Sequence, residues 1–99
     1  MTKLEKAFRH YNRKFFNNQL PNPPETTLSW EHMAWMGYYD RDEERIAIAK
    51  RDYSSDRLWR FTLVHEMVHM LLPAGSGHGP KFQAEMLRLA QAGAFKDLW

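Results

Sequence analysis

One run of five residues has the types and spacing needed for metal chemistry: His65-Glu66-Met67-Val68-His69, the pattern HExxH. Residues four apart on an α-helix lie on the same face, so both imidazoles can point at one metal ion. The side chain of Glu66 is rotated by about 100° from that of His65 and can reach a water beside the metal without binding the metal itself. This pattern is typical of zinc peptidases, in which the zinc activates a water and the glutamate acts as general base.

A catalytic zinc takes three protein ligands and leaves its fourth position to water, so a third ligand must lie downstream. We favour His78, because the glycine-rich stretch 73–79 can reverse the chain and return this imidazole to the helix. Glu85 is the alternative ligand, since a carboxylate on the following helix plays this part in one large class of zinc peptidases. Glu85, Tyr38 and Tyr39 are also candidates to support the metal ligands or the oxyanion, with core packing as the other role for the tyrosines.

The elements that position these residues begin with a helix. Thr2 and Glu5 have the spacing of a capping box, and apolar residues then recur at helical intervals. The helix should extend to about Asn17, because the prolines from Pro21 onward cannot continue it.

Three short segments rich in β-branched and aromatic residues follow, at 26–30, 35–39 and 45–49. We expect them to form a small antiparallel sheet, in which the polar stretch 40–44 closes a hairpin between the second and third strands. Gly37 inside a strand indicates a bulge or a close approach of the backbone to a neighbour.

Two helices complete the order. The helix with the HExxH pattern should begin at Ser54 or Ser55 and end at Pro73, and it is apolar almost all the way round, so it belongs in the interior. Pro80 opens a last helix that Gly93 ends. The predicted fold class is α+β.

Composition narrows the function further. Ninety-nine residues suit a single domain over residues 1–99, and the absence of cysteine excludes cysteine-based zinc sites and thiol nucleophiles. A net charge of +2 is too small to indicate a nucleic-acid binder by itself. No apolar run could span a membrane and the first residues lack the pattern of a signal peptide, so we expect a cytoplasmic monomer without a membrane partner.

Four stretches can be compared with known families: 15–21 (FFNNQLP), 36–39 (MGYY), 62–69 (TLVHEMVH) and 77–82 (GHGPKF). Together they resemble the SprT-like zinc metallopeptidase domain, which occurs in bacterial SprT proteins and in the Spartan proteases that degrade DNA-protein crosslinks. The resemblance implies a zinc ion held by His65, His69 and His78, with Glu66 as catalytic acid and base.

The matched stretches span residues 15–82 and resemble the catalytic core alone, because family members usually continue past the third helix and this chain stops at Trp99. We therefore expect a minimal zincin-type domain, with the three-stranded antiparallel sheet packed on the HExxH helix. The expected function is zinc-dependent cleavage of unfolded or DNA-crosslinked protein, with nucleic acid as a further partner. Two alternatives are a non-catalytic zinc module that recruits protein or nucleic acid, and a latent peptidase whose cleft is covered by residues 95–99.

Overall fold

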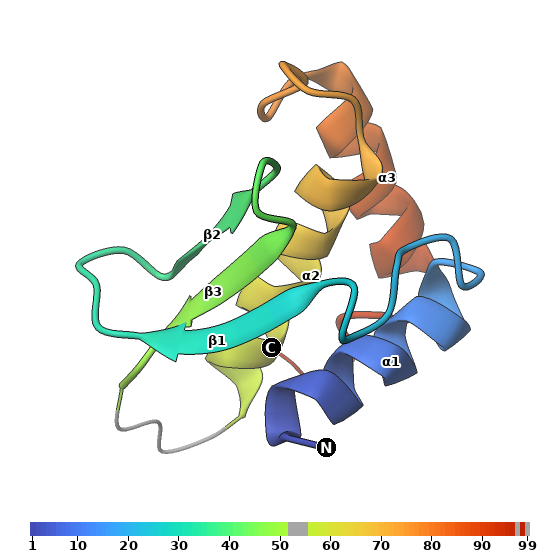
Figure 1. Cartoon of the computed structure of the whole chain (residues 1–99). Helices are drawn as coiled ribbons and strands as arrows, with labels where there is room; N and C mark the ends of the chain where they lie inside the picture. Colours follow the sequence, from blue (N-terminus) through green and yellow to red (C-terminus); the bar gives the residue numbers. More distant parts are fainter. Residues whose placement is uncertain (52–55, 97, 99) are drawn as a thin grey trace.

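The structure is a computed structural model that describes residues 1–51, 56–96 and 98 (Figure 1). One helix precedes a sheet of three strands, and two helices follow it, so the predicted α+β order is confirmed. The elements are α1 (Lys3–Phe15), β1 (Thr27–Glu31), β2 (Gly37–Asp40), β3 (Arg45–Ala49), α2 (Arg57–Leu71) and α3 (Pro80–Gln91). None of the helices described is both long and apolar enough to cross a lipid bilayer.

The first helix begins where the capping box predicts. The backbone N–H of Glu5 donates to the hydroxyl of Thr2 over 3.1 Å, and the Thr2 N–H donates to the Glu5 carboxylate over 2.8 Å. The helix ends at Phe15, just before Asn17 and Asn18 adopt left-handed backbone angles with φ of 54° and 57°. Its apolar face is buried against the rest of the domain.

The sheet differs from the prediction, because it is mixed rather than antiparallel. Its order is β1-β3-β2, with β2 antiparallel to β3 as the predicted hairpin requires, and β1 parallel to β3 (Figure 1). The most apolar strand, β3, takes the centre, where Ile46 and Ile48 are fully buried. Since the hairpin occupies one side of β3, β1 pairs with the other side, and the chain crosses from there to β2 through residues 32–36.

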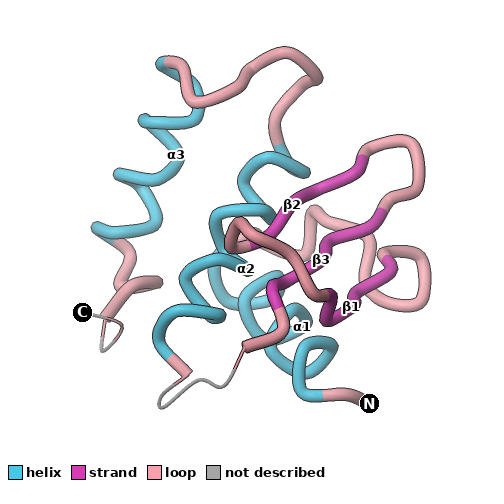
Figure 2. Tube along the Cα trace, turned by 90° about the vertical axis from the view of Figure 1, so that its left-hand side faces the viewer, coloured by secondary structure: helices cyan, strands magenta, loops and turns pink. Residues whose placement is uncertain are grey.

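The helix α2 lies between the sheet and α3 (Figure 2). It is buried along most of its length, as its apolar sequence predicts, with Trp59, Leu63, Val64 and Met67 almost inaccessible to solvent. The predicted starts at Ser54 and Ser55 fall outside the described residues, and Asp56 directly precedes the helix. Most of the surface of α2 is therefore covered by neighbouring elements.

Gly37 allows β2 to approach α2 closely. A Cβ atom at this position would lie 2.7 Å from the carbonyl oxygen of Ala47 and 2.9 Å from Cγ2 of Thr62, both closer than normal packing allows. The close approach predicted from the glycine is confirmed, and it sets the distance between the strand and the helix that carries the histidines.

Replacing this glycine tests that constraint. We expect Gly37→Ala to lower the free energy of unfolding by about 1–3 kcal/mol, because backbone and helix must move apart to admit the methyl group. The midpoint of thermal unfolding measures the loss, and Gln91→Ala on the exposed end of α3 serves as the control. An unchanged midpoint in Gly37→Ala would show that the contact imposes no constraint.

Candidate metal centre

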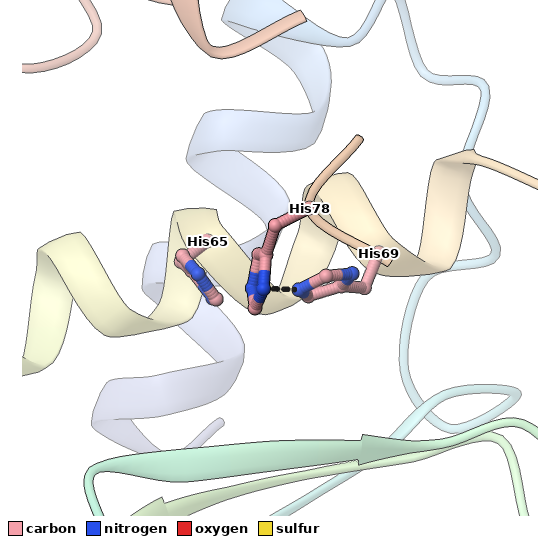
Figure 3. A group of neighbouring side chains, drawn as sticks. All are labelled: His65, His69 and His78. Atoms are coloured by element: carbon pink, nitrogen blue, oxygen red, sulfur yellow. Dashed lines mark hydrogen bonds between the residues drawn. The ribbon is translucent and has the colours of Figure 1, made fainter. Parts of the chain in front are cut away.

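Three histidines meet at one point of the fold. His65 and His69 extend from α2, and His78 reaches them from the turn between α2 and α3 (Figure 3). One ring nitrogen from each lies within 4.8 Å of the others, and the Nε2 atoms of His69 and His78 are 3.1 Å apart. Two nitrogens bound tetrahedrally to one zinc ion would be about 3.3 Å apart. The nitrogens of His69 and His78 are thus already close to the spacing that a single metal ion requires, and a nitrogen of His65 lies within 4.8 Å of them.

The turn that delivers His78 follows from its prolines and glycines. Pro73 lies just beyond the end of α2, and Gly75 and Gly77 then take left-handed angles, with φ of 86° and 52°. Side chains with a Cβ atom rarely adopt this conformation, so glycine at these positions allows the reversal. The Gln83 side chain donates to the His78 carbonyl over 3.1 Å and ties the turn to α3.

Phe82 packs among all three imidazoles. Its ring centroid lies 5.0 Å from that of His65 and 4.8 Å from those of His69 and His78, and it stacks on His69 at an angle of 21°. The side chain is buried. In the sequence, Phe82 stands out only as the last residue of the stretch 77–82, four positions after His78.

Glu66 lies beside the histidines with only 9% of its side chain exposed. Its carboxylate is 3.2 Å from Nδ1 of His65. With Nδ1 as the donor in this contact, the lone pair of Nε2 is left to bind a metal. Both residues line a cavity of about 590 Å³ together with His69 and His78.

Burial lowers the pKa of His69 below its ordinary value of 6.5. The charge of Glu66 opposes this shift, whereas His65, His78 and Arg41 add to it. The neutral imidazole, which is the form that binds a metal, is therefore favoured at neutral pH. The chemistry of the donor set and its spacing both fit one metal ion.

Arg41 connects the sheet to this centre. Its guanidinium donates to the carbonyl oxygens of His69, over 3.0 Å, and Leu72, over 2.8 Å, where α2 ends, and it lies 5.2 Å above the ring of Tyr39. A cation at the carboxyl end of a helix stabilises the exposed carbonyl groups. Its role is not evident from the sequence, since Arg41 stands in the charged run 40–44, which resembles an ordinary solvated turn.

The comparisons with known proteins decide the family. The model of the SprT-like family matches residues 4–97, nearly the whole chain. The chain belongs to the SprT-like family. The searches of curated proteins and of solved structures found no match. The resemblance inferred from the four stretches is confirmed, and the HExxH run and His78 of this SprT-like chain are the residues that its structure brings together.

The other predicted residues of the SprT-like site lie in different places. Tyr38 lines the cavity, but its side chain lies on the sheet face opposite α2, where its hydroxyl donates to Glu31 over 3.0 Å. Tyr39 lines the cavity from the inner face of the sheet, beneath Arg41. Glu85 is held by Arg88 over 3.0 Å and lines a separate hollow beside Phe15.

Among the described residues, the three histidines are the one group of three that could hold a metal ion, and Glu85 is not part of it. The C-terminal stretch does not fill the cavity as far as it is described. Phe95 is buried in the core of the SprT-like domain and packs 5.3 Å from the ring of Phe61. Residues 97 and 99 of the stretch predicted to cover the cleft fall outside the described residues.

Removing the proposed third ligand tests the donor set. We expect His78→Ala to weaken zinc binding at least roughly tenfold and to lower the melting temperature of the zinc-loaded protein, because two imidazoles hold the ion less tightly than three. Zinc content after dialysis, measured by mass spectrometry, gives the result. His32→Ala, at an exposed histidine outside the group, should change neither value. Loss of zinc in Glu85→Ala together with its retention in His78→Ala would reverse the assignment.

Proposed function

We propose that this SprT-like domain is a zinc-dependent endopeptidase. The observation that carries the proposal is the convergence of His65, His69 and His78 on one side of a cavity that also holds the buried carboxylate of Glu66. Three imidazoles with an open fourth position are the ligand set of a catalytic zinc. Zinc is also the ion that such nitrogen donors suit in a site without redox chemistry.

Glu66 is the proposed general base and acid. Zinc, when bound, lowers the pKa of a water and polarises the carbonyl of the bond to be cleaved. Glu66 lies next to the proposed ligand His65, and in this proposal it takes the proton from that water and returns it to the departing amine. Burial shields its carboxylate from bulk solvent.

The edge of the sheet offers a binding surface for the substrate backbone. Among the described strands, β2 pairs with β3 alone, and three of its residues, Gly37, Tyr38 and Tyr39, line the cavity. An extended peptide can pair with such an edge through main-chain hydrogen bonds, which tolerate many sequences. We therefore infer that the substrate is protein in an extended or unfolded state, and that DNA-crosslinked protein is a subclass to be tested with added DNA.

Substitution of the proposed base separates catalysis from metal binding. We expect Glu66→Gln to keep one zinc per chain and its fold, and to lose cleavage of a casein substrate by about 10²–10⁴-fold, since the amide cannot accept the proton. Initial cleavage rates with and without single-stranded DNA give the result, and Glu85→Gln is the matched control. Undiminished cleavage by zinc-loaded Glu66→Gln would reject the mechanism. Zinc binding without any cleavage by the native chain would favour the recruiting module.

A further inference from the structure

A second hollow, which we call the side pocket, adjoins the candidate metal centre. Its volume is about 280 Å³, several times the roughly 30 Å³ that one water occupies. Three of its lining residues, Gly37, His65 and Glu66, also line the larger cavity. The two hollows therefore meet beside the proposed base, and the glycine between them has no side chain to separate them.

The rest of the side pocket is apolar. Its wall is formed by Met36, Leu58, Phe61 and Thr62. The hydroxyl of Thr62 donates to the Leu58 carbonyl over 2.8 Å within α2, whereas its methyl group points toward Gly37. Apart from Glu66 at the boundary with the larger cavity, the described lining contains no Asp, Glu, Lys or Arg. Such a surface stabilises an apolar side chain that moves into it from water. It provides no oppositely charged partner for a charged side chain other than Glu66 itself.

The side pocket is bordered by a partly exposed leucine and by a hydrogen-bonded segment that leads into β2. Leu58, in the first turn of α2, is 46% exposed, and Trp35, next to Met36 in the chain, is 62% exposed. Arg51 donates to the carbonyl oxygens of Ala34, over 3.1 Å, and Trp35, over 3.4 Å, which fixes the segment that leads into β2. Leu58 thus presents a large apolar side chain to solvent at the wall of an apolar hollow.

We propose that the side pocket binds an apolar side chain of the substrate, on a residue next to the bond that is cleaved. This proposal rests on the proposed function and adds a substrate class to it: unfolded segments with exposed apolar residues. Side chains alternate between the two faces of a strand, and Tyr39 of β2 lies on the same face as Ile46, toward α2. Every second side chain of a peptide paired with β2 would then point toward α2 and the side pocket.

Leu58 is the position that tests the pocket. It can be changed without removing core packing, and a carboxylate in the first turn of a helix is favoured by the helix dipole, so Leu58→Glu should keep the fold. The matched control is Leu87→Glu, at a leucine of α3 that is 59% exposed and lines none of the described hollows near the metal centre. A melting curve establishes that both variants are folded.

The experiment uses two series of short peptides. In one series the residue before the cleaved bond is Leu, Lys or Asp, and in the other series the residue after that bond is varied in the same way. Dissociation constants are measured by calorimetry on zinc-loaded protein in the Glu66→Gln background, and kcat/KM is measured with Glu66 present. Because the side pocket would bind the residue on one side of the bond, we expect a preference in one of the two series. In that series the Leu peptide should bind at least tenfold more tightly than the Lys and Asp peptides. Leu58→Glu should reduce the preference for Leu over Lys at least tenfold, and Leu87→Glu should leave it unchanged.

The two readouts distinguish failure of the side pocket from failure of the proposed function. Cleavage with equal preference for all peptides, or a preference that Leu58→Glu does not alter, would overturn the side pocket and leave the peptidase intact. Selective binding that Leu58→Glu changes, without cleavage by the native chain, would support the pocket and overturn the peptidase. Neither binding nor cleavage of any peptide would overturn both.

Discussion

The domain depends on the burial of α2, a helix that is apolar almost all the way round and yet carries the polar residues of the site. Leu63, Val64 and Met67 have almost no contact with water, and each of them needs a neighbouring element to cover it. His65, Glu66 and His69 lie on the same helix, where unpaired polar groups would cost several kcal/mol. The fold therefore has to cover most of α2 and leave open to the cavity the strip that carries His65, Glu66 and His69.

Two residues without ionisable groups determine the width of that strip. Gly37 brings β2 against α2 on one side, and Phe82 fills the space among the three imidazoles on the other. Arg41 then joins the end of the hairpin to the end of α2, next to His69. Sheet, helix and the turn with His78 are thus positioned by contacts that have no part in the chemistry, which is how a small domain can preorganise a metal centre.

The sequence predicted those parts of the structure that local rules govern. The capping box of Thr2 and Glu5, the end of α2 before Pro73 and the start of α3 at Pro80 all depend on neighbouring residues. The meeting of His65 and His69 follows from helical spacing, and that of His78 from the glycines of the turn. A segment rich in β-branched and aromatic residues, in contrast, indicates a strand but not its direction. The parallel pairing of β1 with β3 was therefore missed.

The roles of Arg41 and of the side pocket were hidden for a related reason. Arg41 stands among charged residues in a turn, and its partners lie 28 and 31 positions away, at the carboxyl end of α2. The wall of the side pocket combines Met36 with Leu58 and Phe61, from two segments that touch only after the sheet and the helix have packed. Contacts between distant segments leave no periodic signal in the sequence.

The most direct measurement is X-ray absorption at the zinc edge on the metal-loaded native chain. We predict one zinc with three imidazole nitrogens and one water oxygen, at about 2.0–2.1 Å. The histidine contribution should fall to two rings in His78→Ala. A site with a protein carboxylate in place of the third imidazole, or with four protein ligands and no open position, would contradict the central claim that His65, His69 and His78 form an open catalytic centre.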